Sequence, residues 1–127
     1  MWLGMTESNR FIPGSKPAVL EVDGWRLGLA ICKDTGIPQH ASDTAALGID
    51  AYVAGTVKSV DEAALQDARA RRVATDHRVW VAVASFAGAT GGRYAQAAGR
   101  SGIWTCDGVL VAQAGPETGA TTHATLS

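Results

Sequence analysis

The sequence is short of several residue types, and each shortage excludes a class of protein. Two cysteines among 127 residues are too few for a disulfide-stabilised scaffold, and the spacing of His and Cys predicts no metal site. Eleven basic and twelve acidic side chains leave a formal net charge of −1, which gives no electrostatic reason to bind nucleic acid or an anionic membrane. No apolar run approaches the roughly 20 residues of a membrane-spanning helix, and the N-terminus lacks the features of a signal peptide. We therefore expect a cytoplasmic protein with neither nucleic acid nor a membrane as a partner.

What is present indicates one globular domain over residues 1–127. Hydrophobic residues make up 46% and charged residues 18% of the chain, proportions that are typical of folded rather than disordered proteins. Alanine and glycine account for 23 and 15 residues, whereas aromatic residues make up only 6%. Such a composition allows helices to pack closely on a sheet, although codon bias in the source genome explains it equally well.

Strands and helices alternate along most of the sequence. Helices are predicted at residues 38–47 and 59–77, the second of them with a capping box formed by Ser59 and Glu62. Hairpin turns are predicted at Asp23-Gly24 and Asp107-Gly108. The predicted strands are residues 18–22, 25–31, 49–54, 79–85, 101–105, 109–114 and 121–126. This order favours an α/β layered fold.

Two of these elements carry more detailed predictions. The strand 79–85, VWVAVAS, is apolar on both faces, which is typical of a strand that is covered on both sides. In the helix that ends near residue 77, the predicted buried stripe contains Leu65, Ala68, Arg72 and Val73.

Cys32 is the first candidate for chemistry, because it ends an apolar strand and precedes a turn into a helix. Open α/β sheets place their sites at such carboxyl ends of strands. A helix N-terminus or a nearby cation makes a thiol more nucleophilic, and the backbone N–H of Lys33 is a candidate oxyanion donor. Two alternatives remain: Cys32 is a small buried hydrophobic residue, or it pairs with His40 in a small Cys-His thiol hydrolase.

The segments around Cys32 resemble the nitrilase, or carbon–nitrogen hydrolase, superfamily. GWRLGLAICKD followed by TGIP is similar to the nucleophile segment of that family, with matches at Gly28, Ile31, Cys32, Asp34 and Pro38. The upstream segment TESNRFIPG is similar to the family's Glu-x-x-Arg-Phe-x-Pro-Gly. The resemblance continues through LGID, through RARRVATDHRVWVAVAS and through SGIWTCDGVLVAQAG. These segments follow the family's order and span nearly the whole chain.

The resemblance implies a fold and a mechanism. Residues 1–127 are expected to form part of a nitrilase-type αββα sandwich that hydrolyses a non-peptide C–N bond of a small amide, nitrile or carbamoyl compound. Cys32 matches the nucleophile and Glu7 the second, orienting glutamate, and no cofactor or metal is required. Family members associate through helices beside the nucleophile, and Ala41, Ala45 and Ala46 would permit close helix approach. A homodimer or a higher homo-oligomer is therefore expected.

The sequence also departs from the family pattern. The family's catalytic lysine would fall at or just before residue 1, and its general-base glutamate further upstream, so the chain resembles a domain that lacks its N-terminal part. A late start codon, a cloned fragment and a decayed relative all explain this departure. We therefore expect the isolated chain to be inactive on amides, and a catalytically inactive subunit that serves as a scaffold is the non-enzymatic alternative. In addition, Gly36 replaces an arginine that is usual in the turn after the nucleophile.

Overall fold

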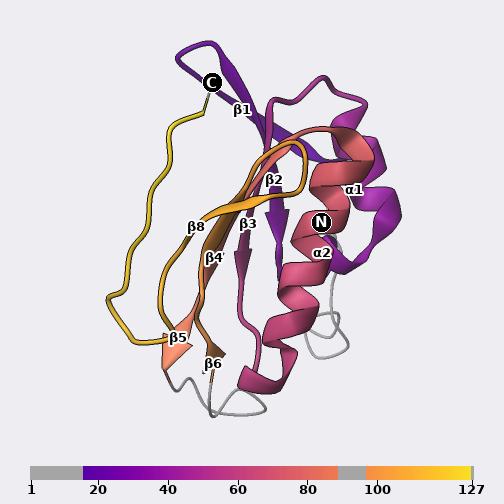
Figure 1. The fold of residues 1–127 in the computed structure, drawn as a ribbon. Coiled ribbons are helices and arrows are strands. Elements are labelled where there is room, and N and C mark those ends of the chain that lie inside the picture. Colours follow the sequence, from indigo (N-terminus) through magenta and orange to yellow (C-terminus); the bar gives the residue numbers. More distant parts are fainter. Residues whose placement is uncertain (1–15, 89–96, 127) are drawn as a thin grey trace.

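A computed structural model describes residues 16–88 and 97–126 (Figure 1). The helices are α1 (Pro38–Ala45) and α2 (Ala63–His77), and two short 3-10 helices are η2 (Cys32–Gly36) and η3 (Val60–Glu62). The strands are β1 (Ala18–Val22), β2 (Trp25–Ile31), β3 (Ala51–Thr56), β4 (Trp80–Ser85), β5 (Ala87–Gly88), β6 (Ala97–Ala98), β7 (Gly102–Trp104) and β8 (Leu110–Gln113). The α/β class predicted from the sequence is confirmed.

Six strands form one mixed sheet in the order β1-β2-β3-β4-β7-β8. The central strands β2, β3 and β4 are parallel, and the outer strands are added by antiparallel hairpins. Asp23 and Gly24 both have positive φ angles, 49° and 84°, which is the geometry of a tight type I′ turn. The strand predicted at residues 121–126 is wrong: this segment pairs with no strand in the described chain, and its side chains alternate between exposed and half-buried.

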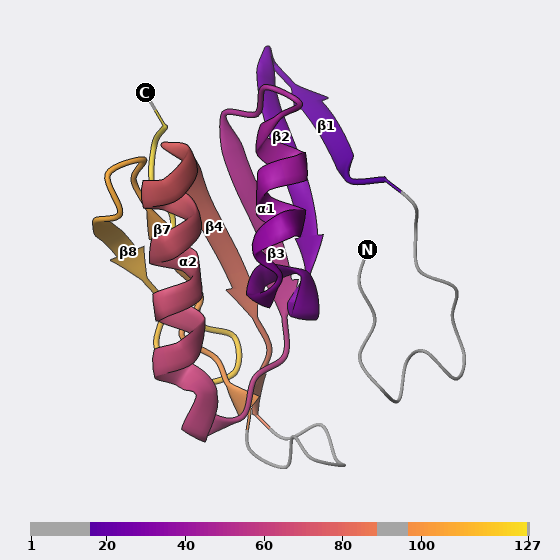
Figure 2. The same cartoon turned by 90° about the vertical axis from the view of Figure 1, so that its right-hand side faces the viewer.

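Both helices pack against the same face of the sheet (Figure 2). The Ser59–Glu62 capping box forms as predicted, but of the stripe predicted on α2 only Val73 is buried. The buried residues of this helix are Ala63, Gln66, Ala70, Val73 and Ala74. Leu65 is instead 43% exposed, because the small alanine side chains bring the opposite face of the helix close to the sheet. In the described residues, neither α1 nor α2 is long and apolar enough to cross a bilayer.

Helix α1 lies close to β2 because Gly28 has no side chain. A Cβ atom on Gly28 would lie 2.4 Å from the Thr44 Cγ2 atom of α1. The Arg26 guanidinium then secures the end of this helix by donating to the carbonyl oxygens of Leu47 and Gly48, at 2.9 and 3.1 Å. These contacts hold α1 against β2, and the segment that joins the two elements contains Cys32.

The two faces of the sheet differ in what covers them. Tyr52, Val81 and Trp104 are buried under the helices. The opposite side, here called the open face, carries the alternate side chains, and one row of it crosses all six strands. Cross-strand register places in that row Ala18, Leu29, Val53, Ala82, Ile103 and Ala112. On this face neither helix covers the side chains, so strand β4 has helix cover on one side only.

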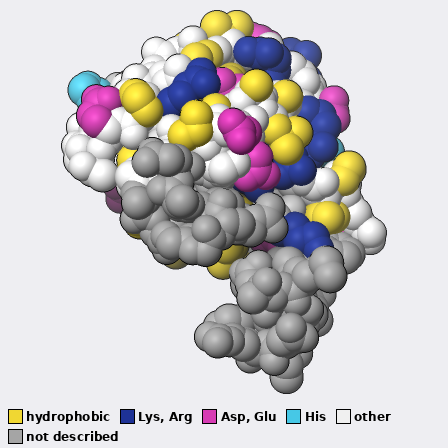
Figure 3. All heavy atoms as spheres, turned by 90° about the horizontal axis from the view of Figure 1, so that it is seen from below, with side chains coloured by type: hydrophobic (Ala, Val, Ile, Leu, Met, Phe, Trp, Pro, Cys, Tyr) yellow, Lys and Arg dark blue, Asp and Glu magenta, His cyan; other side chains and the backbone are white. Residues whose placement is uncertain are grey.

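The parallel strands all end at the bottom of Figure 1. Seen from that end, hydrophobic, basic and acidic side chains are interspersed over the described surface (Figure 3). This mixture agrees with the small net charge of the chain.

Candidate active site

Cys32 lies where β2 ends and η2 begins, and its backbone conformation is unusual. Its φ angle is +40°, in the left-handed region that residues other than glycine rarely adopt. The Thr35 hydroxyl donates to the Cys32 carbonyl oxygen at 2.7 Å, and the Asp34 carboxylate accepts a hydrogen bond from the Ile31 N–H at 2.9 Å. Strained backbone that is fixed by its surroundings is typical of functional sites, and here it carries a nucleophilic side chain.

The Cys32 thiol borders an open cleft of about 680 Å³. The thiol is half-buried and donates to the Val57 carbonyl oxygen, with a sulfur–oxygen distance of 3.4 Å. The cleft is lined by Ile31, Cys32, Gly55, Thr56, Val57, Ala84, Ser85, Phe86 and Ser101. Its volume falls within the range of roughly 300–1,000 Å³ that is usual for small-molecule sites. A small, largely apolar compound can therefore approach the sulfur.

Beneath the turn lies a buried cluster of three polar side chains. Asp34, His40 and Tyr52 are 2%, 4% and 1% exposed. The His40 Nε2 atom is 3.5 Å from the Asp34 Oδ2 atom, and the His40 Nδ1 atom is 2.7 Å from the Tyr52 hydroxyl. Burial lowers the pKa of His40, and the Asp34 carboxylate opposes this effect only in part. Burial and the same carboxylate raise the pKa of Tyr52, so at neutral pH the imidazole is neutral and the phenol keeps its proton.

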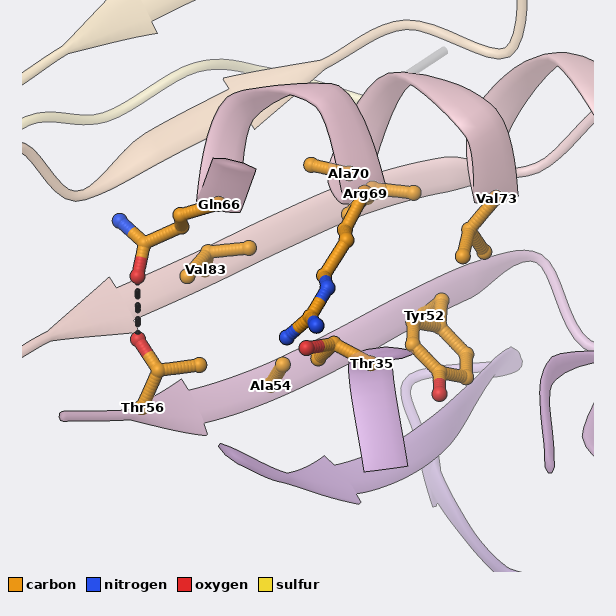
Figure 4. A pocket seen from close by; sticks show the side chains of 10 residues that line it. Thr35, Tyr52, Ala54, Thr56, Gln66, Arg69, Ala70, Val73 and Val83 are labelled. Carbon is orange, nitrogen blue, oxygen red and sulfur yellow. Dashed lines mark hydrogen bonds between the residues drawn. The ribbon is translucent and has the colours of Figure 1, made fainter. Parts of the chain in front are cut away.

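Two arginines of α2 contact the turn from the other side. The Arg72 guanidinium donates to the Thr35 carbonyl oxygen at 2.9 Å. The Arg69 side chain extends toward Thr35 (Figure 4), and its Cζ atom lies 2.6 Å from where a Cβ atom of Gly36 would be. The space beside Gly36, where the nitrilase-like pattern has an arginine side chain, is thus filled by an arginine from a different element.

The comparison with protein families identifies the family of the chain. A family model described as carbon-nitrogen hydrolase matches residues 1–127. The chain belongs to the carbon-nitrogen hydrolase family. The predicted membership is therefore confirmed, and with it the expected kind of fold.

The relatives that this chain matches are longer than the chain. A hydrolase of Pseudomonas protegens, described by its position in the pqqF 5′ region, is 30% identical over 97 residues, which are 76% of this chain and 33% of the relative. Saccharomyces cerevisiae Nit3, a branch 10 member of the nitrilase superfamily, is 27% identical with a TM-score of 0.81, and the match covers 92% of this chain and 43% of Nit3. The chain thus spans less than half the length of these relatives.

A Nesterenkonia amidase of the superfamily has the same fold. One of its structures carries the acetamide moiety of fluoroacetamide on the active-site cysteine of that enzyme. It is 24% identical with a TM-score of 0.81, and the match covers 96% of this chain and 45% of the amidase. At this identity the likeness shows the fold alone.

The structure locates some of the predicted site residues of this family member. Cys32 follows the carboxyl end of β2, as predicted, and borders the cleft, whereas its role as the nucleophile stays a prediction. Lys33 follows it in η2 with an exposed side chain, and the role of its backbone N–H as an oxyanion donor stays a prediction. Glu7 lies outside the described residues. Among those that are described, no three His, Cys, Asp or Glu side chains gather as possible metal ligands.

His40 does not contact Cys32 in the described structure. Its ring nitrogens face Asp34 and Tyr52, while the Cys32 thiol bonds to the Val57 carbonyl oxygen. This geometry gives no support to a Cys-His pair. Cys106 lies in the turn between β7 and β8, which antiparallel pairing with β4 places at the opposite end of the sheet from Cys32.

Three residues of this region were not singled out from the sequence. Tyr52 is the hydrogen-bond partner of His40, and Arg69 fills the space beside Gly36. Ser85 borders the cleft, and its buried hydroxyl has no partner among the described residues. Tyr52 and Ser85 could have been identified from the sequence, because each is a polar residue in an apolar strand, where a buried polar group needs a hydrogen-bond partner.

Proposed function

We propose that this chain provides the nucleophile of a hydrolase that cleaves the C–N bond of a small non-peptide amide, nitrile or carbamoyl compound. The observation that carries the proposal is the position of Cys32, a thiol on a strained turn beside a cleft of about 680 Å³. Membership of the carbon-nitrogen hydrolase family agrees with this chemistry.

The proposed reaction on an amide has two steps. The Cys32 thiolate attacks the carbonyl carbon, a C–S bond forms, and the oxygen becomes an oxyanion that the Lys33 N–H helps to stabilise. The C–N bond then breaks, the nitrogen leaves with the proton that the Cys32 thiol gave up to the general base, and a thioester remains. In the second step water attacks the thioester, which releases the acid and returns the thiol.

Other groups that this reaction needs are proposed to come from outside these 127 residues. The family resemblance implies a lysine for the oxyanion and a glutamate as the general base, and neither has a counterpart in this sequence. Glu7 is proposed to help orient the lysine and the substrate. Loss of one oxyanion donor typically reduces the rate about 10²–10³-fold, and loss of the base reduces it roughly 10²–10⁴-fold. We therefore propose that the isolated chain forms an acyl-enzyme but does not turn over amides.

We also propose that the complete protein forms a homodimer or higher homo-oligomer through the α1 side. The structure corrects one part of this prediction: Ala41 is only 2% exposed and packs within its own chain, since it lies on the sheet-facing side of α1. Ala46 and Leu47 are exposed and remain available for contact with a second subunit.

An activated ester tests the nucleophile directly, because a p-nitrophenolate leaving group needs no proton. The purified chain should release about one equivalent of p-nitrophenol in a burst and then stall. Cys32→Ala should abolish the burst, whereas Cys106→Ala, the matched control, should preserve it. A burst that persists in Cys32→Ala would refute the proposed nucleophile. Sustained amide hydrolysis by the isolated chain would show that the missing groups are not needed.

A further inference from the structure

The three polar side chains beneath Cys32 come from three different elements. Asp34 belongs to η2, His40 to α1 and Tyr52 to β3. None is more than 4% exposed, so their contacts are shielded from water and their mutual orientation is fixed by packing. Three elements thus meet at one buried point under the nucleophile.

The contacts form a continuous path from Tyr52 to the residue before Cys32. Because the Asp34 carboxylate beside Nε2 can only accept a hydrogen bond, the Nδ1 atom of neutral His40 is assigned as the acceptor of the Tyr52 hydroxyl, at 2.7 Å. The ring proton of His40 is then on Nε2, which faces the Asp34 Oδ2 atom at 3.5 Å. The same Oδ2 atom accepts the Ile31 N–H at 2.9 Å. Asp34 thus links His40 to the peptide unit that precedes Cys32.

We infer that His40 and Tyr52 are positioning residues for Cys32. They hold the Asp34 carboxylate where it binds the Ile31 N–H, and this bond helps keep Cys32 in its left-handed conformation with the sulfur at the cleft. The inference rests on the proposed role of Cys32 as the nucleophile. His40 acts through Asp34 and not as a base, because its two ring nitrogens already face Tyr52 and Asp34.

Three substitutions separate this role from simple packing. His40→Leu fills the site with an apolar side chain and removes both polar contacts. His40→Gln supplies one acceptor for the Tyr52 hydroxyl and one donor for the Asp34 carboxylate, and so restores both. Tyr52→Phe removes only the hydroxyl. Val79→Ala, in the core at the other end of the sheet, is the control for a general loss of stability.

The measurement is the rate of alkylation by iodoacetamide at each cysteine of the full 127-residue chain, followed by peptide mass mapping. Cys106 is the internal reference, because it lies at the opposite end of the sheet. In the parent chain, Cys32 should react faster than Cys106. Relative to Cys106, the Cys32 rate should fall about tenfold in His40→Leu and about threefold in Tyr52→Phe, the sizes expected for lost buried hydrogen bonds. In His40→Gln and in Val79→Ala, the Cys32 rate relative to Cys106 should stay within about twofold of its value in the parent chain.

The outcomes are distinguishable. If the parent chain labels Cys106 first, the proposed nucleophile fails and the positioning role fails with it. If the parent labels Cys32 first but His40→Leu behaves like Val79→Ala, only the positioning role is overturned. An equal fall in His40→Gln and His40→Leu overturns it as well, since polar contacts would then not matter. If His40→Leu does not fold, Tyr52→Phe and His40→Gln still decide between these outcomes.

Discussion

The two faces of the six-stranded sheet are made from similar residues but have different surroundings. On the helix-covered face, Tyr52 and Trp104 are 1% and 0% exposed. On the open face, Leu20, Leu29 and Ile31 are 51%, 38% and 53% exposed. Soluble proteins rarely leave a continuous apolar surface of this kind uncovered. We propose that the open face packs against the second sheet of an αββα sandwich, supplied by protein outside the described residues.

Strand β4 illustrates the difference, because its apolar pattern suits cover on both sides while the described residues cover one side only. Strand β4 was predicted to be covered on both sides, and its residues fit that environment on both sides. In the described structure only the side with Val81 and Val83 is buried under helix α2. The cleft beside Cys32 opens on the other side, because Ile31, Gly55 and Ala84 belong to the open face.

The largest effect on stability is expected for Trp104, which is fully buried on the covered face. Trp104→Ala should lower the free energy of unfolding by about 3–5 kcal/mol, because it leaves a large cavity under α2. Trp104→Phe is the control, since it keeps most of the volume and removes an indole N–H that has no partner among the described residues. Urea unfolding followed by circular dichroism measures both. Equal losses for the two variants would contradict the cavity explanation.

A smaller effect is expected at Gly28, where α1 approaches the covered face. Gly28→Ala should cost about 1–3 kcal/mol, because the new methyl group would overlap the Thr44 methyl group. Gly55→Ala provides a matched change on the open face, where nothing lies within 4 Å of a Cβ atom. It should be neutral or slightly stabilising in the same unfolding assay. A comparable cost at both glycines would mean that the open face is already covered.

The buried cluster of Asp34, His40 and Tyr52 should make the free energy of unfolding depend on pH. The pKa of His40 is lowered by burial, so below about pH 6.5 the unfolded chain binds more protons than the folded chain. The contribution of neutral His40 to the free energy of unfolding should be fully present above about pH 6.5. It should decline as the pH falls toward the lower, folded-state pKa of His40. Urea titrations at about pH 7.5 and about pH 5.5 measure this. His40→Gln should lose stability less between these two pH values, and an unchanged pH dependence would contradict this origin.

The smallest effect is expected at Leu29, the neighbour of Gly28 on the opposite face. Leu29→Thr should change the free energy of unfolding by no more than about 0.5 kcal/mol, because the side chain is partly exposed and threonine suits a strand. Binding of a hydrophobic dye should decrease in this variant. A loss as large as that of Trp104→Ala would instead indicate that a second copy covers this face in solution, which sedimentation velocity would detect.

Most of the fold could be predicted from the sequence, because the local signals for its turns and helix starts are strong. The Asp-Gly turns marked both hairpins, and the Ser59–Glu62 capping box marked the start of the long helical segment. Cys32 was placed correctly from local signals too, since an apolar strand followed by a turn and Pro38 defines the end of a parallel strand.

Other features depended on contacts between distant elements. An alanine-rich helix has little contrast between its sides, so the buried side of α2 was predicted around Leu65 although Gln66 and Ala70 are the residues that face inward. Gln66 is buried because it accepts a hydrogen bond from the Thr56 hydroxyl at 2.7 Å. The partner of His40 is similarly decided by packing, because it lies on the following strand.

Apart from the two arginines of α2, the side chains and carbonyl groups that hold the Cys32 turn lie close to it along the chain. The turn's neighbours Ile31, Asp34, His40, Tyr52 and Val57 all fall within residues 31–57. Short loops close faster than long ones, so contacts near in sequence form ahead of distant ones. These local contacts of the Cys32 turn can therefore form once β3 pairs with β2, whereas the hydrogen bond from Arg72 to the Thr35 carbonyl oxygen must wait until α2 docks.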